Sequence, residues 1–564
     1  MISKSNAAFY YMTDGYQTSG KSLMGRQSAG EGFLKGFARH AGVDMFYCYA
    51  PDNKQFQHFK QTVSGVTSKN DVCTFIPYEQ FTLLSRVGCL YLPGPGLSKD
   101  AWVRRAFNSR AYSLCGITHT TATDRVMDSF GTLMIDPVQS WDAIVCTSTV
   151  VRKTVERVIG WYGDYLQERM GVRPDMPVQL PIIPLGVDCD QYADQNSANY
   201  RAQWREKLEV SDNDIAVLYM GRLSFTTKAH PLPMAMALEE AARRTKRKIC
   251  MVLAGWFDPP ASETVWKEEV KKFCPSVNVV FLDGRDMSVR KEIWSAADIF
   301  VSLSDNIQET FGLTPIEAMA AGLPVIVSDW DGYQDTVRHG IDGFRIPVYM
   351  PGPGAGEDLA LRYANQVDSY GRYCGTVNQM TSVDIGACVE AFSALIKDKT
   401  LRSKMGTAGR QRARSLYDWS VVVGMYQDLW TELAQRRLLE RENAPLKKGK
   451  PSHPLRLDPF TLFQEYPTGH ITRKSMITLQ GGKIPGWVEH VNSSVMNSYI
   501  RDQRLLLTTE EQGKVLEHMQ EREQAAVSDI LKIFPDNRKI VALRSIAWMC
   551  KNGILALVRP KISS

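Results

Sequence analysis

The chain has 564 residues, of which 44% are hydrophobic and 23% are charged. This length is enough for about three or four domains with separate cores, and the composition is that of a globular protein, which excludes a disordered or fibrous chain. The net charge of +6 is small for the length, so it neither demands nucleic acid nor excludes a weakly basic face on an anionic membrane.

Residues 1–20 lack the long apolar core of a signal peptide, and no run of eighteen apolar residues occurs. We therefore expect a cytoplasmic protein, which leaves room for a peripheral position at the inner face of the membrane. The eleven cysteines form no C-x-x-C pair, and several lie in apolar strand-like runs, as at Cys48, Cys146 and Cys250. Buried free thiols are favoured over disulfides or a zinc site.

Apolar strand candidates alternate with helical patterns in the first part of the chain, at 8–15, 44–50, 71–77, 89–94, 114–120 and 143–148. This alternation predicts a parallel sheet with helices on both faces. Between the first two candidates, the segment Gly25 to Gly32 predicts a glycine-rich strand-to-helix turn, where the backbone around Gly30 can approach a phosphate or a sugar closely. Glycines at such turns also often serve only the bend.

His119 follows an apolar run and precedes several threonines. In open parallel sheets, ligands bind beyond the carboxyl ends of the strands, which is where we expect His119 to lie. A histidine at a strand end is also often a hydrogen-bonded structural residue, so this position alone leaves both interpretations open.

A second alternating run has strand candidates at 215–221, 248–256, 277–284, 297–304, 324–330 and 343–348. It predicts a second Rossmann-like domain. Arg222 and Lys228 follow its first strand, where two cations can neutralise a diphosphate, arginine with a bidentate fork and lysine as a point charge. Surface cations are otherwise usually solvated.

The stretch 305–330 carries the most functional information. Glu309 and Glu317 bracket a Phe-Gly-Leu-Thr-Pro turn, and an apolar helix, a glycine stop and a Val-Ile-Val strand follow. Thr314 is the predicted N-cap and Pro315 the first helical residue, so the helix start beside the turn is a natural anion site. Thr314-x-x-Glu317 also matches a capping box, in which Glu317 would serve only its own helix.

Two Asp-x-Asp pairs, Asp188 with Asp190 and Asp329 with Asp331, resemble the start of a metal site. Hard cations need clustered oxygen ligands, and two aspartates are too few to specify one. Both pairs lie in predicted turns, where aspartate is common. We therefore predict no metal and no other cofactor.

The later part of the chain contains a glycine-rich insertion at 350–366, which predicts a surface loop or lid. A helix with core residues at helical spacing starts near Trp419. Residues 443–460 are polar, basic and rich in proline, which predicts a linker. Helical patterns at 510–520, 524–534 and 538–558 then suit a winged-helix-like module. Its last helix lacks a strong basic stripe, so protein docking or packing is favoured over DNA binding.

The pattern Glu, seven residues, Glu, with Phe-Gly-Leu inside and Glu-Ala-Met-Ala-Ala-Gly-Leu-Pro-Val-Ile after it, closely resembles the signature of retaining glycosyltransferases of family 4, which have the GT-B fold. The resemblance implies that Glu309 contacts the donor sugar and Glu317 holds the nucleotide ribose. It implies phosphate contacts for Phe311, Gly312, Leu313 and Thr314, a diphosphate clamp for Arg222 and Lys228, and a place beside the scissile bond for His119.

Two features depart from the family pattern. Ala29-Gly30 stands where a Gly-Gly pair is usual, and one more residue than usual separates Arg222 from Lys228. The resemblance covers roughly the first three quarters of the chain. It also implies that the helix starting near Trp419 packs back across both domains.

The sequence thus predicts an α/β protein of the GT-B fold, with two Rossmann-like doubly wound domains facing across a cleft. The predicted parts are an acceptor-side domain at 1–205, a nucleotide-sugar-binding domain with a crossover helix at 206–442, a linker at 443–460 and a mostly helical accessory module at 461–564.

The functional hypothesis is a retaining hexosyltransferase that moves a sugar from a nucleotide-sugar donor to an acceptor hydroxyl, in polysaccharide or glycoconjugate synthesis. Glycan, lipid-linked and small-molecule acceptors all stay open. The alternative is a regulatory protein that senses sugar nucleotides and acts through its C-terminal module.

Overall fold

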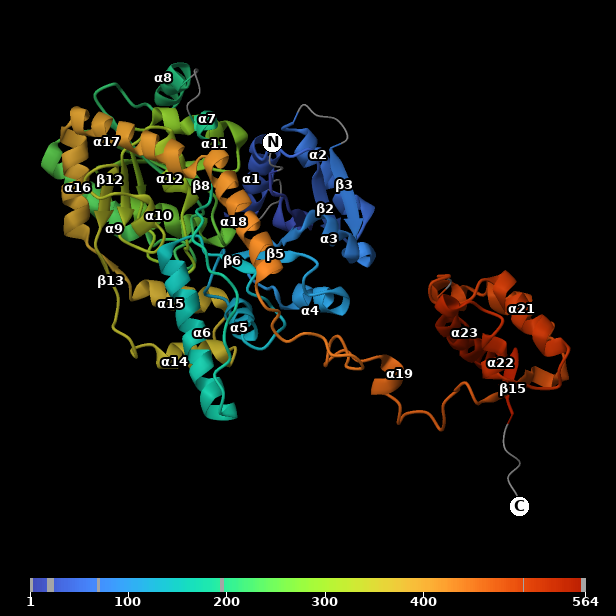
Figure 1. The fold of residues 1–564 in the computed structure, drawn as a ribbon. Helices are drawn as coiled ribbons and strands as arrows, with labels where there is room; N and C mark the ends of the chain where they lie inside the picture. The colour runs from blue at the N-terminus through green and yellow to red at the C-terminus, as the bar shows by residue number, and fades with distance from the viewer. Residues whose placement is uncertain (1–3, 18–24, 68–71, 193–196, 501, 559–564) are drawn as a thin grey trace. The chain divides into compact units, whose positions relative to one another are not determined.

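The computed structural model describes residues 4–17, 25–67, 72–192, 197–500 and 502–558. The chain divides into two compact units, Met1–His453 and Pro454–Ser564. The first unit contains two six-stranded parallel sheets with helices packed around them (Figure 1).

The first sheet has the strand order β3-β2-β1-β4-β5-β6, and all of its pairs are parallel. The direction of strand addition reverses between β1 and β4, which is the switch point where open sheets of this kind bind ligands. The strands are β1 Ala8–Tyr10, β2 Phe46–Ala50, β3 Cys73–Pro77, β4 Cys89–Tyr91, β5 Ser113–Ile117 and β6 Ala143–Val145. Its helices are α1 Gly25–His40, α2 Asn53–Ser64, α3 Leu84–Val87, α4 Ser98–Phe107, α5 Asp124–Thr132 and α6 Thr149–Met170.

The second sheet repeats this order as β12-β11-β10-β7-β8-β9, again all parallel, with its switch point between β7 and β10. Its strands are β7 Ile215–Met220, β8 Ile249–Gly255, β9 Asn278–Asp283, β10 Ile299–Ser302, β11 Val325–Ser328 and β12 Gly343–Ile346. Its helices are α7 Cys189–Tyr192, α8 Ser197–Lys207, α9 Pro231–Thr245, α10 Glu263–Phe273, α11 Met287–Glu292, α12 Leu313–Ala320, α13 Tyr333–Thr336, α14 Glu357–Ala364, α15 Tyr370–Gln379, α16 Ile385–Lys397, α17 Lys399–Arg412 and α18 Trp419–Leu439.

All twelve predicted strands are confirmed, and the inner strands are buried, whereas the outer strands β3 and β9 are mostly only partly buried. β7 and β8 have no exposed residue, which is typical of strands covered by helices on both faces. The helices begin and end at the residues that local chemistry favours. For example, the Ser148 side chain caps α6 by accepting the Val151 N–H, and Gly171 ends it at φ 75°.

Helix α18 returns from the second sheet and packs on the first, as the family resemblance implied. Its residues Trp419, Tyr426 and Trp430 belong to the same buried cluster as Phe33 of α1. Two close approaches fix Trp419 in place. A Cβ added at Gly36 or Gly186 would lie 2.6 Å or 2.4 Å from the indole ring, so both positions must be glycine.

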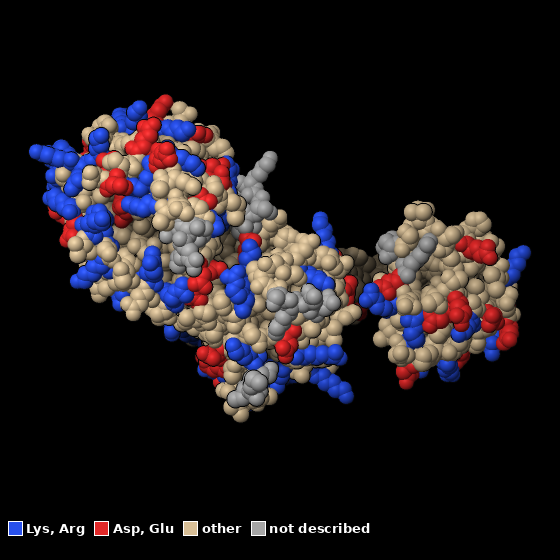
Figure 2. Space-filling view, turned by 90° about the horizontal axis from the view of Figure 1, so that it is seen from above, with Lys and Arg blue, Asp and Glu red and all other residues tan. Residues whose placement is uncertain are grey.

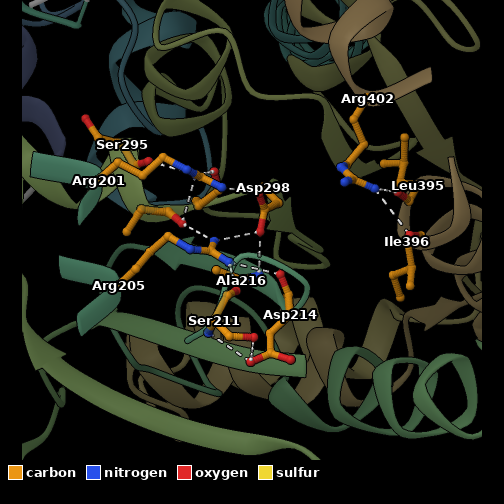
Figure 3. A network of polar contacts seen from close by, with 12 residues as sticks. Arg201, Arg205, Ser211, Asp214, Ala216, Ser295, Asp298, Leu395, Ile396 and Arg402 are labelled. Atoms are coloured by element: carbon orange, nitrogen blue, oxygen red, sulfur yellow. Dashed lines mark hydrogen bonds and ion pairs between the residues drawn. The ribbon is translucent and has the colours of Figure 1, made fainter. Parts of the chain in front are cut away.

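Helix α8 is tied to the start of β10 by the polar network in Figure 3. Arg201 and Arg205 donate to the two carboxylate oxygens of Asp298, at 2.7 Å and 3.0 Å. Asp298 also accepts the Ala216 N–H at 2.9 Å, which satisfies the backbone at the start of β7. Because Arg205 is 4% exposed, this ion pair is buried and holds α8 against the second sheet.

The two sheets and the returning helix make up the predicted GT-B fold. On the face shown in Figure 2, acidic and basic side chains are mixed over both units. Among the helices described, none is long and apolar enough to cross a membrane.

The second unit has its own core and a three-stranded antiparallel sheet of order β16-β15-β17. Its elements are α19 Pro459–Leu462, β15 Met476–Leu479, α20 Val488–Ser493, α21 Thr509–Gln520, β16 Ala525–Ala526, α22 Val527–Leu531, α23 Lys539–Lys551 and β17 Leu555–Leu557. Arg538 and Lys539, at the start of α23, pair with Glu511 and Asp536 of the same unit. The positive charges at the start of α23 are therefore paired with acidic residues of the same unit.

Candidate active site

The carboxyl edges of the two sheets face each other in the first unit. The Thr310 hydroxyl, which follows β10, donates to the backbone oxygen of His119, which follows β5. Nearby, the Ser148 hydroxyl after β6 donates to Asp331 Oδ1 at 3.4 Å. The loop of His119 thus lies beside the loop that carries Glu309, at the place where the two sheets meet.

The two predicted cations lie in the loop after β7, at the switch point of the second sheet. Arg222 is held by a 2.7 Å ion pair with Asp258 and by contacts to Thr227. The Lys228 ammonium group donates to Glu309 Oε2, which places the loop after β7 against the loop after β10. Both cations are largely buried, with side chains 16% and 20% exposed, so their charges are only partly screened by water.

Glu309 is a buried carboxylate held in its ionised form. Burial alone would raise its pKa, but the charge of Lys228 and hydrogen bonds from the Thr310 and Phe311 backbone lower the pKa below its ordinary value. The Thr310 N–H lies 3.3 Å from Glu309 Oε1. Glu309 can therefore accept hydrogen bonds from hydroxyl groups at neutral pH.

Helix α12 starts earlier than predicted. It runs over Leu313–Ala320 with Gly312 as N-cap, and no side chain caps it. Thr314 is therefore the second helical residue, not the N-cap, and the Thr314–Glu317 capping box is not formed. The pattern of Thr314 and Pro315 does not reveal this start, because Gly312 at φ 79° turns the chain into the helix without any capping side chain.

Gly312 lies in a tightly packed position. A Cβ at this residue would come within 1.9 Å of Tyr333 Cε1. The neighbouring Phe311 is 2% exposed and packs on Tyr417 at a centroid distance of 6.2 Å, so its side chain belongs to the core. Leu313 and Thr314 are half-buried in the first turn of α12. This stretch thus presents backbone N–H groups more than side chains.

Glu317 lies on α12 and interacts with Tyr192 of α7. Burial raises the pKa of Glu317, and a hydrogen bond with the Tyr192 hydroxyl partly offsets this. The sequence did not single out Tyr192. Its position one turn after the Asp188 turn gives no signal, because the contact with Glu317 arises only from the packing of α7 on α12.

His119 is half-buried at the end of β5, and it lines a small cavity with Ala29 of α1 and Trp419 of α18. Burial, together with the positive charge of Arg26, lowers the pKa of His119 to about 4, although a hydrogen bond to the Pro93 backbone partly opposes this. Its imidazole is therefore neutral at physiological pH.

The glycine-rich segment is helical, which corrects the prediction of a turn from Gly25 to Gly32. Helix α1 already includes Gly25, while residues 18–24 lie outside the described part of the chain. Gly30 is buried in the second turn, where an added Cβ would lie 2.4 Å from the Gly15 backbone oxygen. Its absent side chain allows α1 to pack closely on the loop after β1.

Two further carboxyls near Glu309 were not predicted. Burial, followed by the charge of Glu309, raises the pKa of Asp331 well above its ordinary value. Burial raises the pKa of Asp305 to about 7, although the His230 backbone N–H and the Asn378 amide both donate to it. The sequence predicts only an ordinary turn at Asp331.

The aspartates of the other Asp-x-Asp pair make ion pairs. Asp188 interacts with Arg39, and Asp190 interacts with Arg414. Within the described residues, no group of three or more His, Cys, Asp or Glu is placed to hold a metal ion.

The part of the chain that contains the second sheet matches a known protein family. Residues 200–352 match the family model Glycosyl transferases group 1. The chain is 25% identical over 243 residues to D-inositol 3-phosphate glycosyltransferase of Geodermatophilus obscurus, covering 41% of this chain and 51% of that protein. It is 28% identical over 158 residues to phosphatidyl-myo-inositol mannosyltransferase of Mycobacterium leprae, covering 28% of this chain and 32% of that protein. The chain thus spans about half or less of the length of these relatives.

Solved structures align with a larger part of the chain at lower identity. The UDP complex of Anabaena Alr3699/HepE aligns with 76% of this chain and 100% of its own, at 14% identity and a TM-score of 0.46. Sucrose-phosphate synthase from Thermosynechococcus elongatus covers 76% of this chain and 96% of its own, at 17% identity and a TM-score of 0.45.

Proposed function

We propose that this chain is a glycosyltransferase that moves a sugar from a nucleotide-sugar donor to an acceptor hydroxyl and retains the anomeric configuration, as in family 4. The observation that carries the proposal is the convergence of Arg222, Lys228, Glu309 and the start of α12 at the switch point between β7 and β10. The group 1 match over residues 200–352 covers this same region.

The cationic residues are suited to the most demanding part of the reaction. When the sugar leaves its diphosphate, negative charge grows on the leaving oxygen, and fixed positive partners in a partly dry site stabilise that charge. Arg222 and Lys228 supply two charges, and the free N–H groups at the start of α12 supply the helix dipole. In this proposal the chain needs no metal for the step.

The two carboxylates bind different parts of the donor. Glu309 accepts hydrogen bonds from the hydroxyls of the sugar, and Glu317 holds the ribose of the nucleotide. A bound diphosphate competes with Glu309 for Lys228, which releases the carboxylate toward the sugar. His119, from the other sheet, contacts the sugar on the opposite side as a neutral hydrogen-bonding group.

Retention follows from attack on the same face that the diphosphate leaves. In this proposal no carboxylate acts as a nucleophile, since Glu309 holds the sugar hydroxyls and Glu317 holds the ribose. The acceptor hydroxyl therefore attacks beside the departing diphosphate, whose oxygen takes the proton. The bond from the anomeric carbon to the diphosphate breaks as the bond to the acceptor oxygen forms.

The first test is the thermal stability of the wild type, Arg222→Ala and Glu317→Ala, each titrated with UDP, GDP, ADP and their common sugar conjugates. A ligand at a hundred times its dissociation constant adds about 2.7 kcal/mol of stability. We expect one nucleotide to stabilise the wild type and neither variant. Arg243→Ala is the control, since Arg243 is exposed on α9 and pairs with Glu240 of the same helix.

The stereochemical part of the proposal is tested by NMR of the product formed from an α-linked donor. An α-linked product supports retention. A β-linked product, or a folded wild type that no nucleotide stabilises, contradicts the proposal.

A further inference from the structure

The segment 348–383, between β12 and α16, forms a small closed structure beside the second sheet. Strands β13 Val348–Tyr349 and β14 Ser382–Val383 pair in antiparallel fashion at its base, and helices α14 and α15 lie between them. Asp368, 4% exposed, binds Arg362 and Arg372 and ties the two helices together. We call this segment the α14–α15 hairpin.

Aromatic stacking makes the hairpin stiffer still. Tyr363 of α14 and Tyr373 of α15 have ring centroids 4.5 Å apart and an interplanar angle of 3°. The hairpin therefore holds a defined shape, although α14 has no buried residue. The sequence prediction of a loop or lid at 350–366 is corrected in this respect, since most of its second half is helical.

One side of the hairpin rests on the loops that carry the predicted donor residues. A Cβ at Gly375 would lie 3.1 Å from Thr226 Cβ, two residues before Lys228. Asn378 donates to Asp305, four residues before Glu309. Helix α15 thus packs on both loops that hold the Lys228–Glu309 pair.

The other side of the hairpin contacts the domain built around the first sheet, beside His119. The Tyr370 hydroxyl lies 3.4 Å from Thr120 Oγ1, and Thr120 directly follows His119. The Tyr363 hydroxyl accepts the Asp124 N–H at 3.2 Å, at the start of α5. Figure 1 shows α14 and α15 near α5, consistent with these contacts.

These contacts place Tyr370 between the donor loops and the His119 loop. We propose that the α14–α15 hairpin forms one wall of the acceptor site, with Tyr370 as an acceptor-positioning residue, and that the acceptor is a sugar or polyol. The proposal rests on the proposed glycosyltransferase function. Tyr370 is half-buried beside Thr120 and combines a ring with a hydroxyl, which suits a ligand with alternating C–H and hydroxyl groups.

The role of Tyr370 differs from that of the donor residues. Its hydroxyl hydrogen-bonds Thr120 across the two domains, so it orients the loop that an acceptor must pass on its way to the anomeric carbon. Loss of this hydroxyl weakens acceptor binding and leaves the donor contacts of Arg222 and Glu317 in place.

The test is nucleotide release by the full-length protein from the nucleotide sugar that the thermal titration identifies. Methyl α-glucoside, methyl α-mannoside, myo-inositol and glycerol are the acceptor probes. We expect at least one probe to accelerate release by the wild type. In Tyr370→Phe, loss of one hydrogen bond should raise the half-saturating acceptor concentration about fivefold, with kcat and the donor KM within about twofold of the wild type.

Tyr373→Phe is the matched control, because it removes a hydroxyl from the same helix that makes neither interdomain hydrogen bond. It should keep the acceptor dependence of the wild type. An unchanged half-saturating concentration in Tyr370→Phe overturns the role of Tyr370, and no acceleration by any probe overturns the acceptor class. If the wild type binds no nucleotide sugar, the proposed function fails, and this inference fails with it.

Discussion

Gly312 shows how a single residue shapes the candidate site. Its left-handed backbone starts α12 without a capping side chain, and Tyr333 fills the space where a side chain would be. The free N–H groups of the first turn are therefore left for a ligand. The same crowding makes the position intolerant of change.

Gly312→Ala should lower the free energy of unfolding by about 3 kcal/mol or more, since it combines an unfavourable φ with overpacking against Tyr333. Chemical denaturation of the purified variant measures this loss. Gly352→Ala is the control, because an added Cβ there meets no atom within 4 Å. Equal stability of the two variants would contradict the packing argument.

The stability of the protein depends on pH through His119. Its pKa of about 4 in the folded state lies below the ordinary value for histidine, so the unfolded chain takes up a proton at a higher pH than the folded chain does. The contribution of this group to stability is complete above about pH 6.5 and is lost as pH falls toward 4.

We expect His119→Gln to lose less stability than the wild type between pH 7 and pH 4.5, because the variant has no imidazole to protonate. Urea unfolding at the two pH values measures the difference, and the other titrating groups are common to both proteins. An identical pH dependence would show that His119 titrates normally in the folded protein.

Glycines mark the limit of what the sequence predicts at this scale. The glycines from Gly25 to Gly32, between a strand and a helical pattern, predict a turn, yet the segment is helical although glycine disfavours helices. Close packing outweighs the propensity, since Gly30 meets the Gly15 backbone and Gly36, further along α1, meets Trp419. Such contacts join residues far apart in the chain, so local patterns carry no signal of them.

At the scale of elements, apolar runs were enough to predict the strands, because burial on both faces leaves a continuous hydrophobic signal. The helices α14 and α15 were missed for the opposite reason. Exposed on nearly all sides, α14 has no apolar stripe, and its stability comes from Asp368 and the Tyr363–Tyr373 stack. The cap of α12 was misplaced because a glycine provides it.

The attachment of α8 depends on one carboxylate. Asp298→Ala removes the shared partner of Arg201 and Arg205 and leaves buried charge unpaired, which should cost about 3 kcal/mol or more. Thermal unfolding of the variant measures the change. Glu390→Ala removes an exposed pair with Arg244 and should shift the midpoint little, so a similar shift in both variants would argue against the buried network.

At the scale of the whole molecule, the stretch that follows His453 is open to solvent. The first unit holds the chain up to His453, which stacks on Trp102 at 4.4 Å. Beyond it, Phe460 and Tyr466 are 71% and 83% exposed. Each unit has a separate core.

Brief chymotrypsin treatment should therefore cut first between residues 460 and 466 and leave two folded fragments, since proteases prefer exposed segments without packed neighbours. Mass spectrometry of the early products identifies the cut. The larger fragment should still be stabilised by the nucleotide that stabilises the full chain. First cuts inside α14, which is equally exposed, would show that the hairpin opens more readily than its ion pairs suggest.

The place where the chain crosses between the two sheets has a mechanical consequence. The chain crosses once near Val187 and once near Tyr417, and the two crossings meet where Val187 exchanges backbone hydrogen bonds with Tyr417 and Trp419. The Trp419 indole packs between Gly36 and Gly186. This point can act as a pivot, because both crossings turn there together. Separating the two sheets then means breaking the contacts at His119, Ser148 and Tyr370. These contacts lie away from the pivot and hold the two domains together.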